Sequence, residues 1–355
     1  MAVRGILSLT DRRLLRVAGE GSASFLNGLC SQETALVSER GAIPAAFLSA
    51  KGRVLCDTIL VSAGGHDIFV DCHKDVATPL LRLLLRHRLR ERLTIDDVSD
   101  THRVLAIVPS EAAVAPLSSP IETEVPDCFF PDPRFAALGH RAVLDHESAA
   151  AFSSEDEHDP DAGLSLYHLW RLCCAVPEGP GDLPTDSMMP LHGNLDLLNF
   201  ISFSKGCYVG QENTTRTKHR GAVRRRFFSV ASAADGHPQQ MLDRLELSPS
   251  APLPPAALLQ RPGPKLPGVV APLCLPCEAK VGEELRAVFA QGVTKSVGTV
   301  YSARSSIGLC LLRSEGSFND AEAFQNAPLP AGSLLSTAGG IPLGLRPPPY
   351  VFSSE

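Results

Sequence analysis

One short segment of the chain combines residue types that can do chemistry, and at its centre a cysteine stands between two glycines. It reads Lys205-Gly206-Cys207-Tyr208-Val209-Gly210-Gln211-Glu212. Glycine lacks the Cβ that would keep a ligand away from the backbone. A cation such as Lys205 favours the thiolate over the thiol, and the thiolate attacks electrophiles and binds soft metals. The segment therefore predicts a presented, reactive sulfur at Cys207, with Lys205 as its activator.

The same residue types also allow a structural interpretation. A free cysteine usually behaves as a small buried apolar residue, and Tyr208 can serve as a packing residue. Gln211 and Glu212 would then open a helix, where a carboxylate suits the helix dipole. The two interpretations differ in whether the Cys207 sulfur faces solvent.

A basic run begins inside this segment and continues beyond it. Seven basic residues stand against one acid, Glu212: Lys205, Arg216, Lys218, Arg220, Arg224, Arg225 and Arg226. Such a patch suits a polyanionic tail or an acidic protein surface, although a solvated face remains the alternative. Nucleic acid is disfavoured because the run lacks interleaved aromatic residues for base stacking and the whole chain carries a net charge of −6.

The ten cysteines show no regular spacing of a disulfide framework, so we expect reduced thiols. The adjacent Cys173 and Cys174 are interpreted as packing residues. The pair Cys274-x-x-Cys277 lacks a second pair and does not predict zinc. Because Cys207 alone has a reactive setting, we expect any cluster that it ligates to be shared with a partner.

Length and composition indicate a globular protein of two or three domains. No apolar run is long enough to span a bilayer. The expected strands are 6–17, 43–49, 52–61, 68–70, 94–95, 104–108 and short runs within 281–313 and 328–345. The expected helices are 22–32, 79–93 and one around 167–171. Prolines recur between about 235 and 276, which predicts a disordered insertion.

The helix expected at 79–93 is amphipathic, with leucines on one stripe and arginines on its other faces. A helix that packs by its leucines is the favoured interpretation. Binding to a membrane or to an acidic partner is the alternative.

With Arg216, Gly221 and Arg226, the motif resembles the signature of the YgfZ-type branch of the glycine-cleavage T-protein superfamily. That branch includes mitochondrial iron–sulfur assembly factors. Weaker similarity extends along most of the chain, including the strand around Lys51-Gly52-Arg53 that leads to Asp57. The resemblance implies a two-part folate-binding-type α+β unit over 1–226. It also implies a small C-terminal antiparallel β-barrel over 227–355.

For function, the resemblance implies an accessory factor for [4Fe-4S] protein maturation, acting with A-type carrier proteins. Cys207 would be the thiolate or the ligand of a shared [2Fe-2S] cluster. A folate site is also implied, and the residues assigned to cofactor binding are Asp57, Tyr208, Gln211, Glu212, Arg216 and Arg226. The resemblance implies location in the mitochondrial matrix. Residues 1–16 contain four arginines, as a mitochondrial presequence would, but this segment is too short to be a full presequence.

Two alternatives remain open. The first is a tetrahydrofolate-dependent, aminomethyltransferase-like enzyme anchored on Asp57. It is disfavoured because the stretch 170–175 lacks the family's pterin-reading glutamate, and because His192 stands where relatives often place a glutamate. The second is a non-catalytic scaffold that uses the basic segment.

Overall fold

A computed structural model of the chain describes residues 6–108, 125–152, 160–231, 280–288, 294–304, 307–314, 318, 334–338 and 342–351. The chain forms two compact units. The first consists of residues 1–107, 123–164 and 178–220, and the second of residues 108–122, 165–177 and 221–355. The proline-rich segment 235–276, with Cys274 and Cys277, lies outside the described residues.

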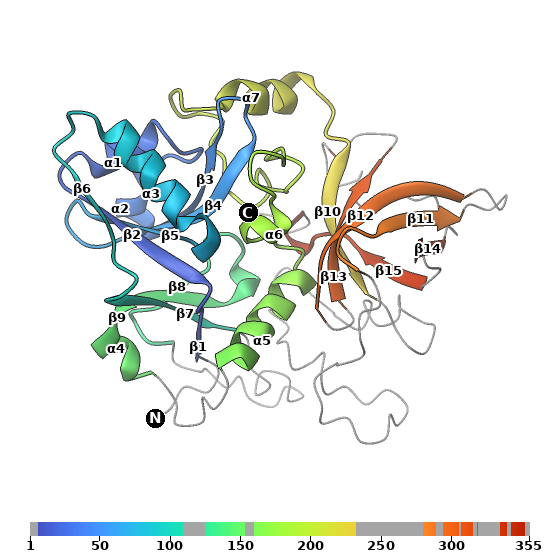
Figure 1. Ribbon diagram of the computed structural model, residues 1–355, viewed down its shortest axis with the longest axis horizontal. Coiled ribbons are helices and arrows are strands. Elements are labelled where there is room, and N and C mark those ends of the chain that lie inside the picture. Colours follow the sequence, from blue (N-terminus) through green and yellow to red (C-terminus); the bar gives the residue numbers. More distant parts are fainter. Residues whose placement is uncertain are drawn as a thin grey trace. The chain divides into compact units, whose positions relative to one another are not determined.

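The first unit is built around a five-stranded antiparallel sheet with the order β3-β4-β5-β2-β6 (Figure 1). Its strands are β2 (Arg12–Ala18), β3 (Ala42–Leu48), β4 (Val54–Ser62), β5 (Ile68–His73) and β6 (Thr94–Asp97). Each strand alternates its side chains between the two faces, so the sheet presents two separate apolar surfaces.

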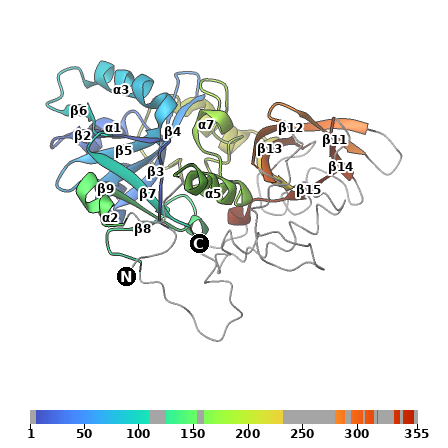
Figure 2. The same ribbon diagram turned by 60° about the horizontal axis from the view of Figure 1, so that its bottom comes forward.

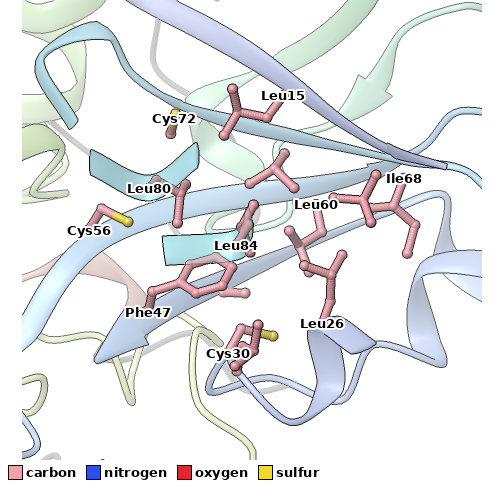
Figure 3. Packing of buried hydrophobic residues seen from close by; sticks show 14 of the residues in the cluster. Leu15, Leu26, Cys30, Phe47, Cys56, Leu60, Ile68, Cys72, Leu80 and Leu84 are labelled. Carbon is pink, nitrogen blue, oxygen red and sulfur yellow. The ribbon is translucent and has the colours of Figure 1, made fainter. Parts of the chain in front are cut away.

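One face of this sheet packs against α1 (Ser22–Asn27), α2 (Leu36–Arg40) and α3 (Lys74–Arg88). Figure 3 shows Leu60 and Phe47 of the sheet converging with Leu80 and Leu84 of α3 and with Leu26 of α1. These five side chains are all nearly inaccessible to solvent, and their burial removes a large apolar area from water. This core holds the helices, and therefore the loops that leave them, in place.

The opposite face packs against a smaller, four-stranded antiparallel sheet with the order β1-β7-β9-β8. Its strands are β1 (Ile6–Ser8), β7 (His102–Ile107), β8 (Phe130–Pro131) and β9 (His140–Asp145). Ile59 and Val61 of β4 form one buried cluster with Phe130 and Val143 from the smaller sheet. The two sheets therefore share a second core.

Four further helices and a 3-10 turn complete the described part of the unit. They are the 3-10 turn (Ala136–Leu138), α4 (His146–Ala150), α5 (Pro160–Cys173), α6 (Gly179–Asp182) and α7 (Gln211–Arg220). Helix α5 continues into the second unit. No helix in the described part of the chain is both long and apolar enough to cross a membrane.

The second unit contains a closed antiparallel barrel with the order β10-β13-β12-β11-β14-β15 (Figure 2). Its strands are β10 (Arg225–Ala231), β11 (Glu284–Val288), β12 (Thr294–Arg304), β13 (Ile307–Arg313), β14 (Leu334–Thr337) and β15 (Pro342–Arg346). A 3-10 turn, Pro349–Val351, follows them. Tyr350 of this turn donates a hydrogen bond of 2.8 Å to the carbonyl oxygen of Ala175, in the same unit. The predicted α+β class and terminal antiparallel barrel are confirmed.

Several element boundaries differ from the prediction. The expected strand 6–17 is two strands in different sheets, and the helix expected over 22–32 ends at Asn27. Helix α3 begins at Lys74, where His73 Nδ1 accepts a hydrogen bond from the Asp75 amide. Pro79, the helix start predicted from the sequence, lies within the helix. The start was missed because histidine is an unusual N-cap residue.

Candidate functional site

The motif loop, residues 199–210, lies against the segment 27–32 that connects α1 to β3. Backbone hydrogen bonds join Ser202 N to Ser31 O at 2.9 Å and Val209 N to Gly28 O at 3.3 Å. The Ser31 hydroxyl also donates to Phe200 O at 2.6 Å. These contacts fix the loop that carries Cys207 to the edge of the first unit's core.

Lys205 anchors the same loop through its side chain. Its ammonium donates hydrogen bonds to three backbone carbonyl oxygens: Asn27 at 2.6 Å, Cys30 at 3.0 Å and Gln32 at 2.8 Å. An ammonium has three protons, so these contacts use all of its donors. The nitrogen also lies 5.1 Å from the centre of the Tyr208 ring, within cation–π range. Lys205 is therefore a structural bracket between the two segments.

The charge of Lys205 acts on the buried thiol of Cys30. Burial raises the pKa of the Cys30 thiol, and Lys205 partly offsets this rise. Burial in turn lowers the pKa of Lys205. Cys30 is fully buried beneath the loop. Activation of Cys207 by Lys205 stays a prediction, because the contacts seen for Lys205 are with segment 27–32 and Tyr208.

Cys207 itself is exposed. Within the described ranges, its side chain makes no hydrogen bond or ion pair. A Cβ added to Gly206 would meet no heavy atom within 4 Å, so open space lies beside the backbone just before the sulfur. The exposed sulfur required by the chemical interpretation is therefore present.

Exposure does not single out Cys207, however. Cys128 is also exposed, although it lacks the neighbouring lysine and glycines of Cys207. Cys173 and Cys174 are buried, as predicted for packing residues. The other described thiols, all buried, are Cys30, Cys56, Cys72 and Cys310.

Gly210 joins the motif to the turn between β3 and β4. Its φ is +83°, and an added Cβ would lie 2.4 Å from the carbonyl oxygen of Ser49. The turn residue Gly52 has a φ of +72°. Both positions favour glycine because other residues rarely adopt such angles. Gly210 therefore allows a close contact between two parts of the chain. The sequence had instead suggested that this glycine lets a ligand approach the backbone.

The residues that follow continue this attachment. Gln211 opens α7, and its side-chain oxygen accepts a hydrogen bond of 3.2 Å from the Tyr208 amide. Asn213 donates a hydrogen bond of 2.8 Å to Lys51 O, and Arg216 donates to the Asn213 side chain. Glu212 lies exposed in the first turn of α7. Helix α7 is therefore tied to the tip of the β3–β4 hairpin (Figure 1).

Tyr208 is buried beside Lys205, and burial raises its pKa to about 12. Its hydroxyl has no hydrogen-bond partner among the described residues. Arg226 is buried on β10, in the other unit. Cofactor binding by these two residues stays a prediction, as it does for Gln211, Glu212 and Arg216.

Asp57 lies within β4, and only 2% of the residue is exposed. Its Oδ1 accepts a hydrogen bond of 2.9 Å from the Gly179 amide. No hydrogen bond to Oδ2 occurs within the part of the chain that the structure describes. Burial raises the pKa of Asp57, although the Arg12 guanidinium opposes this rise. The site is a desolvated carboxyl with one oxygen left for another donor.

A buried ion network lies within the same unit. The guanidinium groups of Arg12 and Arg141 each contact Asp71 at 2.7 Å. Arg134 contacts Asp132 at 2.7 Å and also pairs with Glu178. Longer contacts of 3.5 to 3.7 Å join Arg141 to Asp132 and Arg12 to Glu178. Each of these side chains is at most 2% exposed.

The contacts above pair three buried cations with three buried anions, as buried charges require. The network could not be predicted from the sequence because its members are spread from Arg12 to Glu178. Only Asp132-Pro133-Arg134 offers a local signal, since Asp132 accepts from both the backbone and the guanidinium of Arg134. Burial opposes charge on Asp132, yet Arg134 and Arg141 outweigh it and lower the pKa of that carboxyl.

Comparison with known proteins identifies sequence relatives for this chain. It is 37% identical over 235 residues to the iron–sulfur cluster assembly factor IBA57, mitochondrial, of Homo sapiens, which covers 62% of this chain and 65% of that protein. It is 34% identical over 238 residues to the Mus musculus protein of that name, covering 62% and 64%. An IBA57 homologue of Neurospora crassa is 32% identical over 232 residues, covering 62% and 52%.

The matches thus span less than two thirds of the length of these relatives. No protein-family model matches the chain. Among solved structures, the glycine cleavage system aminomethyltransferase T from Bartonella henselae superposes with a TM-score of 0.61 at 14% identity. This superposition covers 98% of the present chain and 86% of that one. It shows a shared fold, and together with the relatives it confirms the resemblance drawn from the motif.

Proposed function

We propose that this homologue of the mitochondrial IBA57 factors, built on the aminomethyltransferase T fold, assists the maturation of iron–sulfur proteins in mitochondria. In this proposal Cys207 donates its thiolate to a [2Fe-2S] cluster shared with a small A-type carrier protein. The finished clients are [4Fe-4S] proteins. The cluster is the cargo of this reaction, passed on rather than kept.

The observation that carries the proposal is the exposed sulfur of Cys207 on a braced loop. A [2Fe-2S] cluster needs four protein ligands, usually thiolates. The motif loop offers one thiol, so a partner must supply the others. An anchored loop suits this task because a fixed ligand loses little freedom when the partner arrives.

The surface of α7 supports recruitment of such a partner. Arg216 and Arg220 are exposed, and Lys218 is partly exposed while it pairs with Asp196 at 3.2 Å. Positive charge beside the presented thiol favours association with an acidic surface and makes that association sensitive to salt.

A folate is the cofactor that the fold suggests, and Asp57 is the residue that would hold it. The free Oδ2 of this buried carboxyl fits a ligand ring that carries hydrogen-bond donors. A reduced folate, when bound, would carry a one-carbon unit. The Gly179 amide orients the Asp57 carboxyl, and burial excludes water from it.

The proposal is tested by anaerobic transfer. A carrier protein loaded with a [2Fe-2S] cluster is mixed with the wild-type chain, and the complex is isolated by gel filtration while its visible absorption is recorded. We expect a coloured complex with the wild type and none with Cys207→Ser. Because the Cys207 side chain is exposed and unbonded, serine should leave the fold intact.

Cys128→Ser is the matched control, since it removes the other exposed thiol of the described residues. It should form the coloured complex as the wild type does. Equal complex formation by Cys207→Ser and Cys128→Ser would contradict the shared-ligand proposal. For the cofactor, tetrahydrofolate is titrated separately into the wild type and Asp57→Asn. Weaker binding by the variant is expected, and equal binding would remove Asp57 as the anchor.

A further inference from the structure

Helix α3 has two faces of different character, and packing explains only one of them. Its buried residues are Val76, Ala77, Leu80 and Leu84, which face the sheet. At 100° per residue, Arg82, Leu85 and Arg86 point to the opposite side, and Leu89 follows Arg88, the last residue of the helix. Leu85 is 42% exposed and Leu89 is 86% exposed. Two leucines and two arginines thus lie exposed on the outer face and at the C-terminal end of the helix.

Leu89 is unusual in its backbone as well as its exposure. It caps the C-terminus of α3 with φ 46° and ψ −108°, angles that glycine adopts far more readily than leucine. A glycine there would relieve the backbone and remove exposed apolar surface. Strained residues of this kind cluster at sites of function. Packing within the unit therefore does not explain why leucine occupies this position.

The segment that carries this face is itself basic. Between residues 79 and 93 the chain carries five arginines and one acid, Glu91. Arg88 turns inward and donates to the Leu93 carbonyl oxygen at 3.2 Å. The remaining four are exposed: Arg82, Arg86, Arg90 and Arg92. Protruding leucines are therefore flanked by cations that face solvent.

We propose that this face of α3, defined by Arg82, Leu85, Arg86, Leu89, Arg90 and Arg92, docks the protein reversibly on an anionic phospholipid bilayer. Leu85 and Leu89 enter the boundary between head groups and acyl chains, and the arginines contact lipid phosphates. The helix lies parallel to the surface.

A lipid surface fits this face better than an acidic protein does. The protein–protein hot spots that dominate affinity are rich in tryptophan, tyrosine and arginine and poor in leucine, and they fill pockets on the partner. The outer face of α3 has no aromatic residue. An exposed leucine can insert into the apolar part of any bilayer, whereas on a protein it would need a pocket of matching shape.

The test uses vesicle co-sedimentation of the full chain. Vesicles of phosphatidylcholine alone are compared with vesicles of phosphatidylcholine mixed with phosphatidylglycerol. We expect binding to the anionic vesicles, weakening as ionic strength rises. Arg82→Gln with Arg86→Gln should lower the partition coefficient by about twenty-five-fold, since each arginine near the surface is worth about fivefold.

Leu89→Gly separates docking from folding. It should lower the partition coefficient by about tenfold through loss of apolar insertion. It should not lower the midpoint of thermal unfolding, because glycine suits the backbone angles at this position. A purely structural leucine would show the reverse, with a lower midpoint and unchanged binding, and that result would overturn the proposal.

A charge control is provided by Arg40→Gln with Arg103→Gln, which removes two exposed arginines elsewhere in the unit. It should leave vesicle binding unchanged. An equal loss with this control would assign binding to overall charge and reject the α3 face. Binding to soluble polyglutamate that equals vesicle binding and survives Leu89→Gly would assign the face to an acidic protein. Cys207→Ser should not affect any of these measurements, which keeps this test independent of the cluster proposal.

Discussion

Gly210 of the motif loop and Gly52 of the β3–β4 turn meet backbone to backbone. A Cβ on Gly52 would lie 2.9 Å from the carbonyl oxygen of Gly210, and one on Gly210 would lie 3.2 Å from the Cα of Gly52. The loop that carries Cys207 thus packs against a hairpin of the main sheet. This close contact is possible because both residues are glycines.

Gly210→Ala should destabilise the fold by more than about 2 kcal/mol, because the methyl group clashes with Ser49 and the φ is positive. Gly206→Ala is the matched control within the same motif. Its Cβ meets open space, so its effect should stay within about 1 kcal/mol. Urea denaturation followed by circular dichroism measures both. Equal effects would show that the hairpin contact is not what requires glycine at position 210.

Lys205→Met should cost about 3 kcal/mol of unfolding free energy. Methionine keeps much of the apolar stem but leaves the carbonyl groups of Asn27, Cys30 and Gln32 without their donor. Lys74→Met, at an exposed lysine with no side-chain partner in the described residues, should cost less than about 0.5 kcal/mol. Chemical denaturation separates the two. A small loss with Lys205→Met would mean that the bracket contributes little to the anchoring of the loop.

Arg141→Met should destabilise the protein by about 3–5 kcal/mol, because it leaves Asp71 and Asp132 buried with one fewer cation. The exposed pair Arg16–Asp67 provides the comparison, since Arg16→Met there should cost less than about 1 kcal/mol. Adding Asp71→Asn to Arg141→Met should cost less than the sum of the single changes. Additive costs would indicate that the two residues are not coupled through the network.

The motif could be found from sequence because it is local: eight neighbouring residues place a cysteine, a lysine and two glycines in one loop. The roles within it could not be assigned in the same way. Lys205 contacts segment 27–32, more than 170 residues earlier, and no spacing within the motif encodes that contact. The α+β unit and the terminal barrel were predicted from the resemblance, whereas the individual strands and the amphipathic helix leave a periodic record in the sequence.

The ion network left no such record. Its six members come from separate strands and loops, and each looks like an ordinary surface charge until the chain folds. Helix α3 shows an intermediate case. Its leucine stripe correctly predicted a packed helix, yet the stripe is wider than the buried face, and Leu85 and Leu89 remain outside. Periodicity alone cannot tell where a packed face ends.

Asp57→Asn should change the pH dependence of stability in a specific direction. The folded-state pKa of Asp57 is raised by burial, whereas an unfolded aspartate titrates near pH 3.9. Above about pH 4 the unfolded chain therefore releases this proton more readily than the folded chain. The free energy of unfolding falls as pH rises from the unfolded pKa through the folded pKa. Asparagine removes this fall while its oxygen still accepts from the Gly179 amide. The variant should thus gain stability relative to the wild type between acid and neutral pH.

Asp67→Asn gives the opposite sign and serves as the comparison. The hydrogen bond from Arg16 lowers the pKa of Asp67, so this carboxylate stabilises the fold above the unfolded pKa, and the contribution disappears as pH falls through the folded pKa. Asp67→Asn should then cost stability at neutral pH and nothing in acid. Urea denaturation across a pH series measures both differences against the wild type. Suppose instead that the stability gain of Asp57→Asn over the wild type became smaller toward neutral pH. The Asp57 carboxylate would then be stabilised in the folded state, and Oδ2 would already have a partner that competes with any ligand.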